Sequence, residues 1–428
     1  MTDSTNEKRP VRKLTVKNFS VIKEAALEFG KITVLIGPQA SGKSLLCKLA
    51  HFFEKRVPEI VFSGMTAPGS LHLVEEQVLN NFLSYFPEED TQRQGFQICY
   101  EVEPSYSICI EMNDASPTPH VTWKDGFIGA LMNWLARDPK GPPSFNSDRR
   151  RALMSGADIG PMPIKSDSVY IPTGRAFYST PNRAYAVLST KNLDWITSRY
   201  ATEFDAEFRD LRESYQTNRV LLKKVGTCSI EMLKGKVVQE EGRLFFESIE
   251  DRTKRPFEIL SSGTLELLPI FNTLAQVAKN TGYPDHSNMP APQIGTIYIE
   301  EPELSVFPET QYQFAKLIAL LADSNFLWNS YAITTHSPYI LTAFNDLIKA
   351  GQAAKTRPER TAEIEKIIPK EYWISEGDFA AYAFDGKDGI LHSIMDEETK
   401  LINGDVLDDI SETISGEFGQ LLEIQYGD

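Results

Sequence analysis

Short apolar runs of strand length alternate along this chain with longer segments in which apolar residues recur every three or four positions. Such alternation is typical of an α/β protein, because each helix covers a sheet with one apolar stripe. The pattern predicts sheet strands at residues 14–19, 25–29, 32–36, 168–172, 296–299 and 331–334. It predicts helices at residues 43–55, 75–86, 264–279, 309–323 and 338–349.

Two other regions have strand composition without an intervening helix. Residues 96–102 and 106–112 flank a Glu-Pro-Ser turn, which predicts an antiparallel hairpin with a third strand at 120–123. Residues 226–258 predict further short strands. The remaining predicted segments are a disordered lead-in at 1–10, Pro-rich loops at 137–164 and 282–293, a charged helical insertion at 181–225 and an acidic helical tail at 404–424.

A phosphate-binding loop follows the strand at 32–36. The run Gly37-Pro38-Gln39-Ala40-Ser41-Gly42-Lys43-Ser44 has the form G-x-x-x-x-G-K-S, and a helical pattern follows from Leu45. The glycines let successive N–H groups point inward, and the helix adds its positive N-terminal end. In such loops the lysine reaches the β- and γ-phosphates and the serine supplies an oxygen to Mg²⁺. Residues 37–45 are therefore predicted to bind ATP.

A strand that ends in carboxylates supplies the second half of the predicted site. The apolar residues 297–299 run directly into Glu300-Glu301-Pro302-Glu303. Glu300, at the strand tip, is placed to hold Mg²⁺ together with Ser44, and Glu301 to polarise the attacking water. Lys43 and Glu301 are predicted catalytic residues, together with His336 further along the chain.

Two further segments indicate the class of ATPase. Leu260-Ser261-Ser262-Gly263-Thr264 precedes a helix and resembles the L-S-G-G-Q signature of ABC-type ATPases, although Ser-Ser-Gly is also an ordinary helix N-cap. The strand at 331–334 leads into Thr335-His336-Ser337-Pro338, where His336 resembles the switch histidine that senses the γ-phosphate.

The order of phosphate loop, signature, carboxylate pair and switch histidine resembles that of ABC ATPases. The detailed motifs N-F-x-x-I-K-E-A, Y-I-P-T-G-R, L-S-S-G-T, I-E-E-P-E and T-T-H-S-P are similar to those of the AAA15/AAA21-type ATPases. These proteins are related to the OLD (overcoming lysogenisation defect) family and, more distantly, to the RecF and chromosome-maintenance ATPases. In size and layout the chain resembles the ATPase of anti-phage defence systems such as PARIS.

This resemblance implies an ABC-type P-loop NTPase core with a mixed sheet, an antiparallel β subdomain and a helical insertion. It divides the chain into a first ATPase lobe at 1–135, a linker, returning strand and helical insertion at 136–255, and a second lobe at 256–428. It implies a homodimer or higher homo-oligomer in which ATP lies between the phosphate loop of one copy and Ser261, Ser262 and Gly263 of another. No acidic constellation with the D-x-D spacing that a Toprim nuclease domain would have follows His336. A Toprim nuclease is therefore expected as a separate effector.

Composition limits the alternatives. A net charge of −15 disfavours a chain that mainly coats DNA, so a RecF-like repair ATPase is the second hypothesis and an ATP-binding scaffold with little turnover the third. The polar N-terminus and the lack of a long apolar run predict a cytoplasmic protein with no membrane contact. The four cysteines lack metal spacing and are predicted to be free thiols in a reducing compartment, including Cys99 and Cys109 on neighbouring strands.

Several side chains allow two interpretations. Arg175 fits a phosphate or partner contact as well as an internal salt bridge. Asn18 and Phe19 fit an adenine site, but a Phe in an amphipathic strand is more often part of the core. The basic run 149–151 fits a nucleic-acid or protein contact, but such short runs are usually solvated.

Overall fold

The computed structural model describes eleven stretches of the chain, residues 11–64, 71–103, 106–113, 116–124, 168–176, 200, 219–240, 243–280, 295–323, 330–384 and 388–403. Five predictions lie wholly outside these stretches. They are the lead-in, the loops at 137–164 and 282–293, the basic run at 149–151 and the acidic tail at 404–424.

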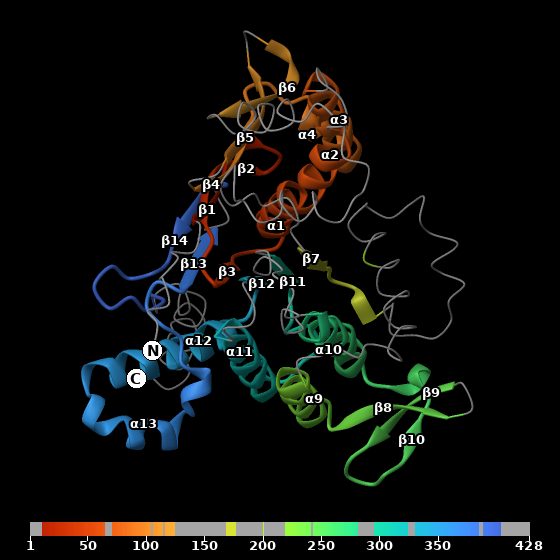
Figure 1. The fold of residues 1–428 in the computed structure, drawn as a ribbon, viewed down its shortest axis with the longest axis vertical. Helices are drawn as coiled ribbons and strands as arrows, with labels where there is room; N and C mark the ends of the chain where they lie inside the picture. The colour runs from red at the N-terminus through yellow and green to blue at the C-terminus, as the bar shows by residue number, and fades with distance from the viewer. Residues whose placement is uncertain are drawn as a thin grey trace, which may run out of the picture.

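A six-stranded sheet forms the centre of the protein (Figure 1). Its order is β14 (Leu391–Ser393), β13 (Phe379–Phe384), β3 (Ile32–Ile36), β12 (Ser330–Thr335), β11 (Thr296–Glu300) and β7 (Val169–Ile171). All neighbours are parallel except β14, which runs antiparallel to β13 at one edge. The strands β11 and β12 are buried throughout, as strands covered on both faces should be. The predicted α/β fold with a mixed sheet is confirmed, although the sequence pattern did not predict β13.

The register of the parallel strands brings three loops to one edge of this sheet. Ile36 of β3 pairs with Thr335 of β12, and Thr334 pairs with Glu300 of β11. Because these strands end at the same level, the segments that follow them leave the sheet side by side, where ligands of open α/β sheets bind. The phosphate loop, the carboxylates and the predicted switch histidine therefore start at neighbouring points.

A second sheet is the predicted antiparallel subdomain. Its order is β2 (Ile22–Glu28), β1 (Val11–Phe19), β4 (Gln97–Glu103), β5 (Tyr106–Asn113) and β6 (Ser116–Lys124). All of its pairings are antiparallel, which confirms the hairpin and its third strand.

Cys99 and Cys109 are joined by a disulfide in this sheet, so the prediction of free thiols is wrong for this pair. The two residues stand directly opposite each other on β4 and β5. Directly opposed side chains of an antiparallel pair are close neighbours, and only the register, which the sequence pattern left open, shows that these two are opposed. Cys47 and Cys228 are free, as predicted. The bonded pair therefore does not support the prediction of a reducing compartment.

Two groups of helices cover the sheets and bury separate apolar cores. The first group, α1 (Lys43–His51), a π-helical turn (Phe52–Arg56), α2 (Val57–Gly64), α3 (Leu71–Tyr85) and α4 (Glu88–Thr91), lies beside the antiparallel sheet (Figure 1). The second group comprises α9 (Arg219–Leu233), α10 (Ser262–Asn280), α11 (Pro308–Ala322), α12 (Pro338–Thr356) and α13 (Thr361–Ile367). Each helix in the described ranges is too short or too polar to cross a bilayer.

The strands predicted at 226–258 begin later than expected. Residues 226–233 belong to α9, and only then follow β8 (Gly235–Glu240), β9 (Arg243–Ser248) and β10 (Lys254–Arg255). Val225, Cys228 and Met232 recur at helical spacing and pack into the core that α10 shares. Gly226 therefore lies within a helix and does not end it.

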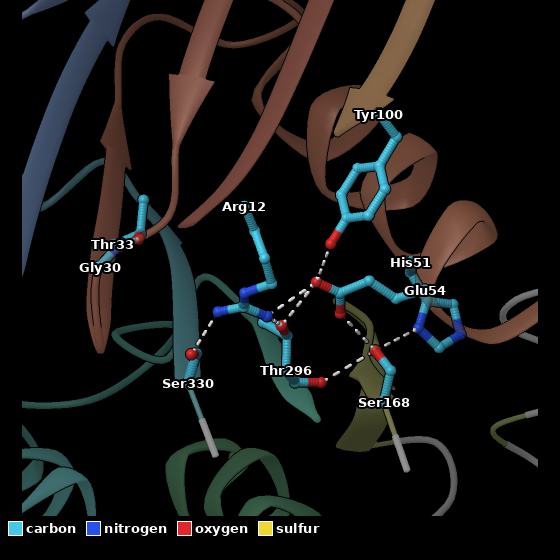
Figure 2. A network of polar contacts seen from close by, with 9 residues as sticks. All are labelled: Arg12, Gly30, Thr33, His51, Glu54, Tyr100, Ser168, Thr296 and Ser330. Carbon is cyan, nitrogen blue, oxygen red and sulfur yellow. Dashed lines mark hydrogen bonds and ion pairs between the residues drawn. The ribbon is translucent and has the colours of Figure 1, made fainter. Parts of the chain in front are cut away.

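A buried polar cluster joins the two sheets at the end opposite the phosphate loop (Figure 2). Arg12 of β1 donates to the Glu54 carboxylate at 2.8 Å, and both side chains are 4% exposed. Arg12 also donates to the Thr296 and Ser330 hydroxyl groups at the starts of β11 and β12. One ion pair thus connects the antiparallel sheet, the helix after the phosphate loop and the central sheet.

Candidate active site

The phosphate loop has the backbone conformation that its glycines predict. Gly37, Ala40 and Gly42 have φ values of 149°, 58° and 106°, in the region that favours glycine. A Cβ atom on Gly42 would lie 2.8 Å from the Ile22 side chain. The loop then enters α1 at Lys43, so its N–H groups and the helix N-terminus face the same space.

Lys43 and Ser41 give this loop unsatisfied capacity for an anion. The Lys43 Nζ atom donates to the carbonyl groups of Gly37 at 2.8 Å and Pro38 at 2.7 Å, and the residue is 5% exposed. Burial lowers the pKa of Lys43, although Glu301 and Glu303 act in the opposite direction. The Ser41 hydroxyl is buried without a hydrogen-bond partner in the described structure. A triphosphate fits these donors, because its oxygens would supply the missing acceptor.

Glu300 ends β11 as a buried carboxylate that is 4% exposed. One of its oxygens accepts from the Tyr170 hydroxyl at 2.5 Å and the other from the Thr173 N–H at 2.8 Å. Tyr170 also lies 3.4 Å from the Ser44 carbonyl. The β7 tyrosine therefore connects the two residues that the sequence predicts as metal ligands. A carboxylate has about four lone-pair sites, so Glu300 keeps capacity for a cation.

Glu301 and His336 form a pair at the carboxyl edge of the sheet. The Glu301 carboxylate lies 3.3 Å from His336 Nε2. Glu301 has a φ of 41°, and its N–H donates to the Thr334 carbonyl, which turns the chain sharply after β11. Both side chains remain about 30% exposed, at 27% and 31% respectively. They can therefore meet a ligand, as a catalytic pair must.

Glu303 fixes the position of His336, a role that the sequence pattern did not predict. Its Oε1 atom accepts from the His336 N–H at 2.6 Å and from the Thr335 hydroxyl at 2.8 Å. The third acidic residue of I-E-E-P-E thus ties the loop after β11 to the loop after β12. Its place in that motif was the only indication the sequence offered.

A cavity of about 450 Å³ lies between these groups. Its lining includes Gln39, Ala40, Ser41, Gly42, Lys43, Ser44 and Leu45 of the phosphate loop, together with Glu301 and His336. Gly37, Pro38 and Glu300 do not line the cavity, although the Gly37 and Pro38 carbonyl groups accept hydrogen bonds from Lys43, which does. Predicted residues from three distant parts of the sequence therefore meet around one space.

The signature-like residues lie outside this cavity. Ser261 and Ser262 are exposed at the start of α10, and the Ser261 hydroxyl accepts from the Thr264 N–H at 3.2 Å, as an N-cap does. A Cβ atom on Gly263 would lie 2.5 Å from the Ser305 carbonyl oxygen. The signature turn therefore packs against the loop that follows the carboxylates and does not line the cavity of its own chain.

Arg175 is fully buried, and its bonds are internal. Its guanidinium donates to the carbonyl oxygens of Glu300 at 2.6 Å, Glu301 at 2.8 Å and Glu266 at 3.0 Å. It also lies 3.4 Å from the Glu266 carboxylate on α10. Burial lowers the pKa of Arg175 and raises that of Glu266. Of the two interpretations, the internal salt bridge is confirmed, and it links the signature helix to the carboxylate turn.

Asn18 and Phe19 do not reach the cavity. Phe19 is 0% exposed and packs against Phe82, Phe86 and Phe96, and Asn18 donates to the Gly95 carbonyl. The core interpretation of Phe19 is confirmed. The next two residues of the β1–β2 turn, Ser20 and Val21, line the cavity instead.

Comparison with known proteins supports the class of this site. Residues 190–341 match the family described as AAA ATPase domain, which covers the signature, the carboxylates and His336 but less than half of the chain. No curated protein matches the chain.

Among solved structures, the SMC head domain from Thermotoga maritima is similar, with 10% identity, a TM-score of 0.40, and 90% of this chain and 98% of that one covered. The Smc head domain bound to the C-terminal domain of ScpA from Pyrococcus furiosus has 10% identity and a TM-score of 0.38, over 95% and 99% of the two chains. The ADP conformation of MJ1267, an ATP-binding cassette of an ABC transporter, has 11% identity and a TM-score of 0.33, over 98% and 100%.

Because these TM-scores are below 0.5, we base the fold on the strand order of the molecule itself. The phosphate loop follows a central strand, a further parallel strand separates it from the carboxylate strand, and an antiparallel sheet lies alongside. The central sheet therefore has the arrangement of a P-loop nucleotide-binding fold, and residues 190–341 are similar to the AAA ATPase domain family.

Proposed function

We propose that this protein binds ATP on residues 37–45 and hydrolyses it at the carboxyl edge of the central sheet. One observation carries the proposal. Lys43, Glu301 and His336 come from three distant segments and line the same cavity. A cation, a carboxylate and an imidazole around a phosphate-binding loop are the groups that phosphoryl transfer to water requires.

Each residue has a distinct role in this scheme. Lys43 leaves the loop carbonyls and pairs with the β- and γ-phosphates. Glu301 orients a water molecule and accepts its proton as the oxygen attacks the γ-phosphorus, so that ADP leaves with the electrons of the broken bond. His336 donates to the γ-phosphate, and Glu303 keeps its backbone in place.

The residues present also fit a magnesium ion. Ser44 and Glu300 would hold it, and it would neutralise charge on the phosphate oxygens. Glu300 already accepts one hydrogen bond on each oxygen, which fixes its orientation toward the Ser44 segment.

We further propose that two copies close on ATP. The exposed signature residues Ser261, Ser262 and Gly263 would address the γ-phosphate held by the other copy. Three large apolar side chains are exposed at this edge. Ile259 is 66% exposed near the signature turn, Phe307 is 74% exposed at the start of α11, and Tyr339 is 57% exposed at the start of α12. Large apolar side chains exposed around a functional edge favour a protein interface there.

The cellular role follows from the motif resemblance alone. Closure on ATP and release after hydrolysis would control a separate effector, a Toprim nuclease, in anti-phage defence. Such control works when contacts with the γ-phosphate stabilise one of two conformations of an interface. The protein would act in the cytoplasm without membrane contact.

Phosphate release by the purified chain tests this function. Glu301→Gln should lower the turnover about 10²- to 10⁴-fold and leave ATP bound, because the amide cannot accept the proton. Sedimentation of that variant with ATP and Mg²⁺ should show a dimer. Glu309→Gln, at an exposed position on α11, is the matched control and should retain full turnover.

Three results would contradict the proposal. Retained turnover of Glu301→Gln would exclude that residue as the base. Stimulation by DNA that salt abolishes would favour the RecF-like alternative. ATP binding by the wild-type chain without phosphate release would favour the scaffold.

A further inference from the structure

The cavity extends beyond the phosphate loop along one face of α1 and of the π-helical turn that follows it. Ser44, Lys48 and Phe52 all line it, and residues four apart lie on the same face of a helix. Eight residues of helix span about 12 Å. The catalytic pair Glu301 and His336 lies with the phosphate loop, so the Phe52 end is free for the part of the nucleotide that carries no phosphate.

The walls at the Phe52 end are aromatic and apolar. Tyr85, Phe86 and Pro87 line the cavity there, at the turn between α3 and α4, and Val21 lines it from the β1–β2 turn. The Tyr85 and Phe86 rings lie 5.6 Å and 6.1 Å from the Phe52 ring. An apolar wall that includes the partly exposed Tyr85 ring suits a base, because every nucleobase has a π-face that stacks on aromatic side chains.

Asp90 adds a polar group to this apolar end. It lines the cavity from α4, and its backbone N–H donates to the Pro87 carbonyl at 3.1 Å, as does that of Thr91. The helical turn therefore fixes where the residue sits. Within the described residues, no hydrogen bond or ion pair engages the Asp90 carboxylate. An ionised carboxylate only accepts hydrogen bonds, so its ligand must present an N–H or O–H group.

We infer that the turn from Tyr85 to Asp90 is the base site and that Asp90 accepts a hydrogen bond from the exocyclic amino group of adenine. The inference rests on the proposed function and goes further, because it names the residue that selects the base. A site that hydrogen-bonds a substrate amino group discriminates strongly against an analogue without it, since the half-buried Asp90 acceptor is then left unpaired.

The test compares ATP with purine riboside triphosphate, which has hydrogen in place of the amino group. The dissociation constant of each is measured by calorimetry with Mg²⁺ on the full-length chain. Wild-type protein should bind ATP about 10- to 100-fold more tightly, as expected for a hydrogen bond to a charged group. Asp90→Ala should bind both nucleotides with the affinity that the wild type shows for the analogue. Glu89→Ala, an exposed neighbour outside the cavity, should behave as wild type.

Equal binding of the two nucleotides by wild-type protein would overturn the inference and leave the proposed function intact. Undiminished discrimination by Asp90→Ala, or tighter binding of GTP than of ATP, would also overturn it. Binding of neither nucleotide would overturn the proposed function and the base site together.

Discussion

Removing the Glu54 carboxylate is expected to destabilise this protein far more than removing an ordinary ion pair. Glu54 accepts from Arg12 at 2.8 Å, from Tyr100 at 2.6 Å and from Thr296 at 2.9 Å, all on one oxygen (Figure 2). Arg12 is 3% exposed, and among the residues that the structure describes its Nε atom already lacks a hydrogen-bond partner. Glu54→Ala would therefore leave a buried cation and two donors without their acceptor.

The magnitude follows from the buried charge. Breaking a buried ion pair by removing one partner costs about 3–5 kcal/mol, because the remaining charge stays away from water. Folded domains have about 5–15 kcal/mol of stability in total, so this loss is large. Urea unfolding followed by circular dichroism should show it as a lower midpoint for Glu54→Ala.

Two further variants separate the buried charge from a general loss of packing. The double variant Arg12→Met with Glu54→Leu removes both charges and should be less destabilised than the sum of the single changes. Lys31→Ala breaks the Lys31–Asp378 pair, whose side chains are about a third exposed at 33% and 31%, and should cost less than about 1 kcal/mol. If Glu54→Ala cost no more than Lys31→Ala, or if the two buried changes were additive, the reasoning would be refuted.

Three other changes test the candidate active site. Lys43→Met should weaken ATP binding about 10- to 100-fold, because a charge-assisted contact to phosphate is lost; unchanged affinity in calorimetry would contradict the role of Lys43. Glu303→Ala should lower phosphate release at least about tenfold by misplacing His336, whereas Glu303→Gln, which keeps an acceptor oxygen, should retain most of it; equal losses in both variants would refute a positioning role. Arg175→Lys should lower kcat by a larger factor than it changes the KM for ATP. The reason is that an ammonium group cannot span the carbonyl groups of Glu300, Glu301 and Glu266 as the planar guanidinium does. A change confined to KM would argue against coupling through the carboxylate turn.

The sequence by itself determined the local elements of the site. G-x-x-x-x-G-K-S needs only short-range geometry, so residues 37–45 could be identified without knowing the fold. The carboxylate strand and the strand before His336 were equally visible, because buried parallel strands are continuous apolar runs. The division at residues 135 and 255 stays a prediction.

Only the tertiary structure decided which side chains meet. Strand order and register are long-range properties, so the sequence pattern could not show that Cys99 faces Cys109 or that β13 lies beside β3. The partners of Arg175 and the cavity wall at Asp90 come from segments far from the phosphate loop in sequence, and packing alone brings them to it. Backbone conformation is set by neighbouring residues, whereas contacts between distant side chains exist only once the sheets and helices have packed.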